Sequence, residues 1–469
     1  MNNARLLING RLVTGDSSAE VINPATGQAF AHAPVASRNQ LDLAVQSARA
    51  AMPVWREMPI HVRRESLIAV AALLESNADA LARLLTMEQG KPLVESRREV
   101  TVSASFFRAL ASLDFTTNQY DSDGRRIWLR RRPLGVAAAI VPWNFPLVLM
   151  SMKVPAALLA GNTVILKPSP TTPLSTLMIG QLIAEVLPAG VLNIINGAPE
   201  LGAWITAHAG IDKISFTGST ETGIRVMAGA ATSLKRITLE LGGNDPAIVL
   251  DDADPKAIAP ALFASAFQNN GQTCIAIKRL YVHDRLYDAV CDELVAIADQ
   301  ARIGDGMNPV NRFGPVQNEI QYRKVLEFIE EGKLHGNVAA GGYVPDGPGF
   351  FIRPTIVRDI VDGNRLVDEE QFGPVLPIMR FDNIDDVVAR ANRSPHGLGS
   401  SVWSCNAAKA HDVAIRLEAG TVWINKHGDL SPDIPFGGAR MSGIGTELGP
   451  HALDEFSQLH VINANAPAT

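Results

Sequence analysis

Only one of the three cysteines in this 469-residue sequence lies in a segment typical of a reactive thiol. Cys274 ends the polar, glycine-containing segment Gln268-Asn-Asn-Gly-Gln-Thr-Cys274. Cys291 lies at helical spacing among apolar side chains and is interpreted as a core residue, whereas Cys405 has no informative neighbours. Because an accessible thiolate is a strong nucleophile, Cys274 is the candidate nucleophile. The alternative is that it is a small buried apolar residue.

A carboxylate and an amide follow two of the predicted strands. Glu240 ends an apolar run just before Gly242-Gly243, so it is either a solvated strand end or a general base in a cleft, where its pKa would be raised. Asn144 lies between prolines and aromatic residues in Pro142-Trp-Asn-Phe-Pro146. Such rigidity suits an amide that stabilises an oxyanion, although a tight turn with an internally bonded Asn has the same pattern.

The segment Gly218-Ser-Thr-Glu-Thr-Gly223 follows one predicted strand and begins a helix. Its backbone could approach a phosphate at the positive end of that helix. Ile224-Arg225 stand where a Walker A loop needs Lys-Ser/Thr, and the glycine spacing is not Gly-x-Gly-x-x-Gly. The pattern alone therefore leaves a phosphate site and an ordinary tight turn both open.

Composition and missing motifs exclude several classes. The 42 basic and 48 acidic residues give a net charge of −6, which argues against nucleic-acid and anionic-membrane partners. No signal peptide, transmembrane segment, His-Glu-x-x-His metal motif or Gly-x-Ser-x-Gly elbow is present, and we expect no metal. Three cysteines without a CxxC pair predict no disulfide framework and a reducing, cytoplasmic compartment.

Hydrophobic patterning predicts the elements that position these residues. A Ser37 to Gln40 capping box begins one helix, and a second helix is expected over about 62–87, ending at Gly90. Short β-rich runs alternating with helices predict a parallel, doubly wound sheet, and the alternation resumes after Gly242-Gly243 in a second α/β domain, with a cleft between the two. The first set of runs is 136–141, 163–166, 191–195, 213–216 and 236–239, and the second is 280–283, 375–380, 399–403 and 421–424.

The one dense basic cluster lies at 125–132, Arg-Arg-Ile-Trp-Leu-Arg-Arg-Arg. Its alternation predicts a strand whose exposed edge is protected by charge, rather than a nucleic-acid or targeting patch.

Seven motifs, in one order along the chain, closely resemble the aldehyde dehydrogenase superfamily, in its hydrolytic, non-acylating type. The resemblance extends from Ile22-Asn-Pro-Ala-Thr-Gly27 to the C-terminal segment. The motifs are Pro142-Trp-Asn-Phe-Pro146, Lys167-Pro-Ser169, Phe216-Thr-Gly-Ser-Thr220, Glu240-Leu-Gly-Gly243, Gly271-Gln-Thr-Cys274, Glu370-Gln-Phe-Gly-Pro-Val375 and Pro435-Phe-Gly-Gly438.

The resemblance implies an α/β fold with two doubly wound open-sheet domains and a small β arm. Residues 1–115 and 134–242 would form the Rossmann-like cofactor domain, and residues 243–440 the catalytic domain. Residues 116–133 and 441–469 would form the oligomerisation arm and the C-terminal strand. The implied assembly is a homodimer or homotetramer, and the implied substrate is a small aldehyde.

The resemblance also implies a role for each site residue. Cys274 would attack the aldehyde, Asn144 with the Cys274 backbone N–H would form the oxyanion hole, and Glu240 would activate the water that hydrolyses the thioester. Lys153 would line the site in an open role. The implied cofactor residues are Val141, Pro142, Trp143, Lys167, Ser169, Pro170, Gly218, Ser219, Gly223, Leu241, Glu370 and Phe372. The implied substrate pocket, mostly apolar, consists of Phe145, Leu149, Met152, Thr273, Ile275, Leu430 and Phe436.

The cofactor implied is NAD or NADP. Many NAD-preferring relatives have Lys-x-x-Glu where this chain reads Lys167-Pro-Ser-Pro170. The carboxylate that would accept the ribose 2′-OH is missing, so we expect NADP to be accepted at least comparably with NAD.

The substrate is expected to be an aliphatic or aromatic aldehyde, with a semialdehyde as the alternative. Lys426 and His427 are either polar groups at the pocket mouth or solvated loop residues. A CoA-acylating enzyme on this fold is disfavoured because such members lack a Glu at position 240. A non-enzymatic structural protein is disfavoured because the three catalytic candidates are intact.

Overall fold

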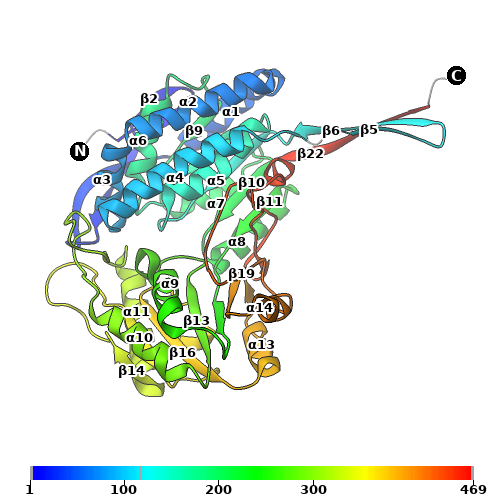
Figure 1. The fold of residues 1–469 in the computed structure, drawn as a ribbon. Helices are drawn as coiled ribbons and strands as arrows, with labels where there is room; N and C mark the ends of the chain where they lie inside the picture. The colour runs from blue at the N-terminus through cyan, green and yellow to red at the C-terminus, as the bar shows by residue number, and fades with distance from the viewer. Residues whose placement is uncertain (1–3, 116–117, 466–469) are drawn as a thin grey trace.

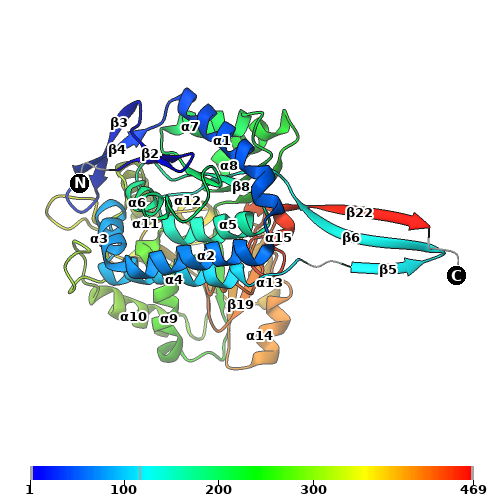
Figure 2. The same ribbon diagram turned by 90° about the horizontal axis from the view of Figure 1, so that it is seen from above.

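The computed structural model describes residues 4–115 and 118–465. Two sheets form its centre, each built mainly from one half of the chain, and a slender arm projects from the body (Figures 1 and 2). The predicted α/β class is confirmed.

The first sheet has eight strands in the order β2-β1-β9-β8-β7-β10-β11-β21. Its five central strands are parallel, and β1 and β21 pair antiparallel to β9 and β11. The bounds are β1 (Leu6–Ile8), β2 (Arg11–Val13), β7 (Val136–Ile140), β8 (Thr163–Lys167), β9 (Leu192–Ile194), β10 (Lys213–Thr217), β11 (Arg236–Glu240) and β21 (Gly443–Ile444).

The second sheet has seven strands in the order β14-β15-β16-β13-β12-β18-β19, and only β14 pairs antiparallel. Two separate apolar clusters pack on its faces, since Ile248 belongs to one and its neighbours Ala247 and Val249 belong to the other. The bounds are β12 (Asp245–Val249), β13 (Ile277–His283), β14 (Asn337–Ala340), β15 (Thr355–Arg358), β16 (Val375–Phe381), β18 (Gly399–Trp403) and β19 (Thr421–Ile424).

Helices cover both sheets. Those of the first half are α1 (Arg38–Glu57), α2 (Ile60–Ser76), α3 (Ala78–Gln89), α4 (Leu93–Ala111), α5 (Pro146–Leu159), α6 (Leu174–Ile183), α7 (Pro199–Ala207) and α8 (Thr220–Ala231). Those of the second half are α9 (Pro255–Phe267), the 3₁₀ helix η1 (Gln268–Gly271), α10 (Tyr287–Asp299), α11 (Glu319–His335), α12 (Arg365–Asp368), α13 (Ile384–Asn392), α14 (Ala407–Ala414) and α15 (Ala452–Glu455).

The N-terminal helices show where local signals worked and where one failed. Ser37 and Gln40 form the predicted capping box at the start of α1, and Gly90 ends α3 in the left-handed conformation with φ 99°. The prediction of a single helix over 62–87 is wrong, because the helical conformation is interrupted at Asn77, between α2 and α3. The Asn77 side chain donates to the Leu73 carbonyl, and this hydrogen bond competes with continuation of the helix.

The arm is a three-stranded antiparallel sheet in the order β22-β6-β5, with β5 (Asn118–Ser122), β6 (Arg125–Pro133) and β22 (Ser457–Asn465). The basic cluster is a strand, as predicted, but it is the middle strand and not an edge. Residues 116–117, expected at the start of the arm, lie outside the described residues. Of the segment 441–469, β21 joins the first sheet and only β22 joins the arm.

Two small pairings complete the sheets: β3 (Ser17–Asn23) with β4 (Gln28–Val35), and β17 (His396–Gly397) with β20 (Ala439–Arg440). Among the described helices, none combines the length and the apolar character that a membrane span requires.

Candidate active site

A cavity of about 730 Å³ opens at the carboxyl ends of the first sheet's strands. Residues just after β7, β8, β10 and β11 line one side, and Cys274, Glu370 and Phe372 from the second half of the chain line another. Ligands of open α/β sheets bind at this edge. The volume lies within the usual range for small-molecule and cofactor sites.

Cys274 lies in the loop between η1 and β13, held in an unusual backbone conformation. Asn269, Asn270 and Gly271 all have positive φ, at 50°, 57° and 74°. A Cβ on Gly271 would lie 2.2 Å from the Gly373 carbonyl oxygen, so only glycine fits there. This turn directs Cys274 into the cavity, where its side chain is partly accessible.

Burial raises the pKa of the Cys274 thiol, and the nearby carboxylate of Glu240 raises it further. The ammonium of Lys278 acts in the opposite direction. Ionisation of this thiol therefore depends on the charges around it.

Glu240 ends β11 and lines the same cavity as Cys274. Its side chain is buried, and neither carboxylate oxygen has a well-formed hydrogen bond within the described part of the chain. Burial and the charge of Glu447 raise the pKa of Glu240 to about 8, while Lys153 and the contact with the Cys274 thiol lower it. A carboxyl group poised in this range can exchange a proton near neutral pH.

Lys153 projects from α5 and forms a fully buried ion pair with Glu447. Glu447 Oε1 also accepts a hydrogen bond from Ser215 Oγ at 3.1 Å. Both members of this ion pair lie close enough to Glu240 to shift its pKa. The structure therefore places Lys153, whose role the sequence did not define, beside the carboxylate of Glu240.

Asn144 is 3 % exposed and lies in the cavity wall beside Cys274. Its Nδ2 donates to the Gln272 carbonyl at 3.0 Å, which uses one of its two N–H groups. The buried ion pair of Lys91 and Glu99 supports it, since Lys91 Nζ donates to the Asn144 carbonyl at 2.8 Å and Glu99 Oε1 accepts from the Leu147 N–H at 2.9 Å. The amide is therefore held rigidly with one N–H left to donate.

The cavity walls contain most of the predicted cofactor residues. Val141, Pro142, Trp143, Lys167, Ser169, Pro170, Gly218, Ser219, Leu241, Glu370 and Phe372 line it. Gly223 lies behind this wall, where a Cβ would come within 2.5 Å of the Leu241 side chain. Glycine at 223 thus permits close packing of α8 against Leu241.

The glycine-containing segment 218–223 follows strand β10 and begins helix α8, as predicted. Ser219 caps α8, and its side chain accepts from the Thr222 N–H. Gly218, Ser219 and Thr222 line the cavity, so the start of the helix borders it. Lys167 ends β8, buried, with its Nζ donating to the Pro168 carbonyl at 3.0 Å. Burial lowers the pKa of Lys167 to about 8. The cavity thus offers helix N–H groups and an amine, groups that fit the phosphates and ribose of a dinucleotide.

Trp143 and Phe372 meet edge to face, with ring centroids 5.4 Å apart, and connect the two halves of the cavity wall. Phe372 has φ 51°, which is rare outside glycine and points to a conformation imposed by the surrounding structure.

The seven predicted pocket residues lie next to this cavity rather than in its wall. Leu149, Met152, Ile275 and Phe436 are buried in the apolar cluster of the first half, and Phe145, Leu430 and Cys274 pack against that cluster. Thr273 is buried and its hydroxyl donates to the Gln268 carbonyl at 3.2 Å. Apolar side chains of this cluster therefore pack against Cys274.

The reading of His427 as a group at the pocket mouth or on a solvated loop is wrong. Its ring is buried, with Nδ1 2.9 Å from Ser401 Oγ and Nε2 2.8 Å from the Ile275 carbonyl. Burial lowers the pKa of His427 to about 3, so the ring is neutral at pH 7. Lys426 is exposed and pairs with Asp429 at 2.8 Å.

Sequence reasoning missed several residues of the site. Lys91 and Glu99 are distant in sequence from Asn144, and Gln321 and Lys324 of α11 line the cavity from the second half of the chain. No local sequence signal marks Lys91, because its burial at 2 % exposure is set only by the packing of α4 and α5 around it. Within residues 4–115 and 118–465, no three His, Cys, Asp or Glu side chains are grouped as a metal site.

Comparison with known proteins gives this site a family. The model of the Aldehyde dehydrogenase family matches residues 12–462. The chain is 39% identical to phenylacetaldehyde dehydrogenase of Pseudomonas fluorescens, over 97% of this chain and 94% of the relative. It is 38% identical to human retinal dehydrogenase 2, over 99% and 92%. An aldehyde dehydrogenase from Bacillus cereus, solved as its NAD⁺ complex, superposes with a TM-score of 0.97 at 38% identity, covering 99% of this chain and 97% of that one.

Fold, cavity and relatives together define an oxidoreductase that uses NAD or NADP. The chain belongs to the aldehyde dehydrogenase family.

Proposed function

We propose that this enzyme oxidises an aldehyde to the free carboxylic acid through a thiohemiacetal and a thioester on Cys274. The observation that carries the proposal is the meeting of Cys274, Glu240 and Asn144 in one cavity whose remaining wall suits a dinucleotide.

In this mechanism the Cys274 thiolate attacks the aldehyde carbon, and the carbonyl oxygen becomes an oxyanion. The free N–H of Asn144 and the Cys274 backbone N–H stabilise that oxyanion. The cavity-wall residues after β7, β8 and β10 would hold NAD or NADP, which would supply the acceptor for the hydride that leaves the same carbon, so that a thioester remains on Cys274. Glu240 then removes a proton from water, and the water attacks the thioester, so that the carboxylic acid leaves and the thiol is restored.

Hydrolysis is favoured over transfer to CoA because a buried carboxylate next to the thiol can activate water. The decisive experiment monitors NAD(P)H absorbance on a panel of aldehydes, with and without CoA, and identifies the product. Free acid formed without CoA supports the proposal, whereas product formed only with CoA contradicts it.

An apolar aldehyde, aliphatic or aromatic, is the proposed substrate class. The apolar residues that pack around Cys274 support it, as do relatives named for phenylacetaldehyde and retinal, which are both apolar aldehydes. A semialdehyde, the alternative, would need a partner for its carboxylate, and the buried neutral His427 does not offer a charge.

The Asn144→Ala variant should slow the chemical step by about 10²–10³-fold, the usual loss for one oxyanion donor. The measurement is the pre-steady-state rate of NAD(P)H formation, with the melting temperature recorded alongside. If stability falls but the rate does not, Asn144 only shapes the turn.

Cofactor preference should follow from Pro170. A carboxylate there would accept a hydrogen bond from the ribose 2′-OH and repel a 2′-phosphate, whereas proline does neither. With Lys167 and Ser169 still in the cavity wall, kcat/KM for NADP is expected to be at least comparable with that for NAD.

The check is kcat/KM for both cofactors in the wild type, in Pro170→Glu and in its neutral control Pro170→Gln. Only the Glu variant should shift preference toward NAD. A wild-type preference for NAD of more than about tenfold, unchanged by Pro170→Glu, would show that pocket shape decides instead.

We also propose that residues 1–115 and 134–242 bind the cofactor, that residues 243–440 form the catalytic domain, and that the enzyme acts in the cytoplasm as a homodimer or homotetramer. The projecting arm supports the assembly, because Leu459, Val461 and Ile462 on its strand β22 are exposed apolar side chains. A free catalytic thiol fits a reducing compartment.

Val461→Lys is expected to lower the molar mass measured by light scattering, since a charge on β22 would oppose docking onto another subunit. Val310→Lys is the matched control, because Val310 and Val461 are equally exposed, at 51 %. Equal masses for both variants would place the subunit interface elsewhere.

A further inference from the structure

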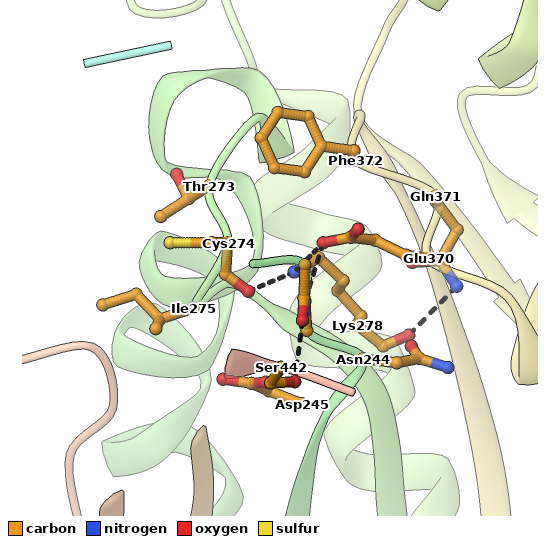
Figure 3. A network of polar contacts seen from close by, with 12 residues as sticks. Asn244, Asp245, Thr273, Cys274, Ile275, Lys278, Glu370, Gln371, Phe372 and Ser442 are labelled. Carbon is orange, nitrogen blue, oxygen red and sulfur yellow. Dashed lines mark hydrogen bonds and ion pairs between the residues drawn. The ribbon is translucent and has the colours of Figure 1, made fainter. Parts of the chain in front are cut away.

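Lys278, the second residue of β13, extends its side chain to residues 273–275, the nucleophile segment, on the side of the Cys274 carbonyl (Figure 3). Its side chain is only 3 % exposed. The Nζ donates to the Cys274 carbonyl and lies 3.1 Å from Glu370 Oε1. One buried ammonium therefore contacts both the main chain of the candidate nucleophile and a carboxylate of the cofactor cavity.

The contact with Cys274 leaves its thiol free. In Figure 3 the sulfur and the carbonyl oxygen of Cys274 point in different directions, and Lys278 is on the carbonyl side. The next carbonyl, that of Ile275, is held by His427 at 2.8 Å. Two basic side chains thus fix two consecutive peptide groups, one with a charge and one with a neutral ring.

The Glu370 side is equally constrained. Glu370 Oε1 also accepts from the Gly243 N–H at 3.1 Å, and a Cβ on Gly242 would lie 2.3 Å from its Oε2. The neighbouring Gln371 donates from Nε2 to the Lys278 carbonyl at 3.4 Å. The segment that carries Glu370 is therefore joined to the start of β13 through both the side chain and the main chain of Lys278.

The charges around Lys278 give this arrangement a chemical consequence. A buried ammonium is costly unless it is paired, and Glu370 supplies the pairing charge. The charge of Lys278 lowers the pKa of the Cys274 thiol and that of buried Asp245, while the charge of Glu370 raises both. The charges of the Lys278–Glu370 pair thus change the pKa of the Cys274 thiol, although Lys278 contacts the carbonyl of Cys274 and not its sulfur.

We propose that Lys278 is a positioning residue that couples Glu370, on the cofactor side of the cavity, to the nucleophile segment, so that it sets both the orientation and the reactivity of Cys274. This inference rests on the proposed role of Cys274 as the nucleophile. It predicts opposite effects at the two ends of the pair: without the Lys278 charge the thiol reacts more slowly, and without the Glu370 charge it reacts faster.

The test is the rate of alkylation of Cys274 by iodoacetamide in the enzyme without cofactor, as a function of pH. A Cys405→Ser background removes the exposed cysteine, and Cys291 is fully buried. Lys278→Met should lower the rate constant at neutral pH by roughly threefold or more and move the midpoint of the pH profile upward. Glu370→Gln should move that midpoint downward, and the double variant should differ from the sum of the two changes.

Cofactor affinity is the second readout. Lys278→Met should weaken NAD binding, measured by fluorescence quenching, by roughly threefold or more, because Glu370 loses its fixed position. Lys278→Arg, which keeps the charge, should restore both readouts in part. If Lys278→Met does not fold, Lys278→Gln serves instead, since it removes the charge and keeps a donor.

Two control variants distinguish the effect of the Lys278 charge from the effect of its hydrogen bond to the main chain. His427→Gln disturbs the neighbouring carbonyl without removing a charge, so its pH midpoint should stay close to the wild-type value. Lys235→Gln removes a buried lysine that donates to the His208 and Ile211 carbonyls at the far end of β11, and neither readout should change. Unchanged alkylation in Lys278→Met and Lys278→Gln, or equal midpoint shifts in His427→Gln, would overturn the inference. Activity retained in Cys274→Ala would instead overturn the proposed function.

Discussion

Replacing Cys274 with alanine is expected to abolish aldehyde oxidation while leaving cofactor binding largely intact. The substitution removes the sulfur proposed to attack the carbonyl, so neither the proposed thiohemiacetal nor the thioester could form. The groups proposed to bind the cofactor lie on other segments, at the ends of β7, β8 and β10 and in the segment of Glu370 and Phe372. The measurements are steady-state NAD(P)H formation and the dissociation constant for NAD by fluorescence quenching.

The exposed Cys405 provides the matched control, since Cys405→Ser changes a cysteine that has no part in the cavity. That variant should keep wild-type activity. Appreciable NAD(P)H production by purified Cys274→Ala would mean that the nucleophile is another group.

Glu240→Gln is expected to give one burst of NAD(P)H and then stall. Acylation needs the thiolate and a hydride acceptor, whereas deacylation also needs an activated water, and loss of a general base typically costs about 10²–10⁴-fold. The charge of Glu240 raises the pKa of the thiol, so its removal should not slow the burst at neutral pH. Stopped-flow absorbance resolves the burst from the steady state.

The pH dependence follows from the same group. The pKa of Glu240 is raised to about 8, so the fraction able to accept a proton increases as the pH rises through that value. Where deacylation limits turnover, the wild-type steady-state rate should rise with a midpoint near 8, and Glu240→Gln should lose this dependence. Glu221→Gln, on the exposed face of α8, is the control and should behave as the wild type.

Two outcomes would reassign Glu240. A wild-type steady-state rate in Glu240→Gln would show that it is not the base for deacylation. Loss of the burst together with the steady state would show that it also takes the proton from the Cys274 thiol.

Many helix ends, strands and candidate site residues of this protein could be predicted from the sequence, because the patterns that indicate them are local. The Ser37 capping box and the Gly90 cap lie where helix ends require them, and buried runs such as β7 have the continuous apolar pattern of a parallel strand. Cys274, Glu240 and Asn144 could be selected as candidates because each lies in a short motif that follows or precedes such an element. The order of the seven motifs along the chain also indicated the family, which the family model matches over residues 12–462.

What only the tertiary structure decided depends on contacts between segments far apart in the chain. No local pattern places Lys91 and Glu99 under Asn144, or Lys278 between the Cys274 carbonyl and Glu370. His427 was misread for the same reason: a polar residue in a glycine-containing loop has the sequence of a surface group, yet here Ser401 and Ile275 satisfy both ring nitrogens inside the protein.

The ionisation of the site residues is the property that the sequence determines least. The raised pKa of Glu240 and the lowered pKa of Lys167 both arise mainly from burial, and burial is fixed only when the sheets and helices pack. Sequence therefore determined which groups this enzyme has available for chemistry. The packed structure determined their ionisation and their neighbours, because electrostatic interactions act through space rather than along the chain.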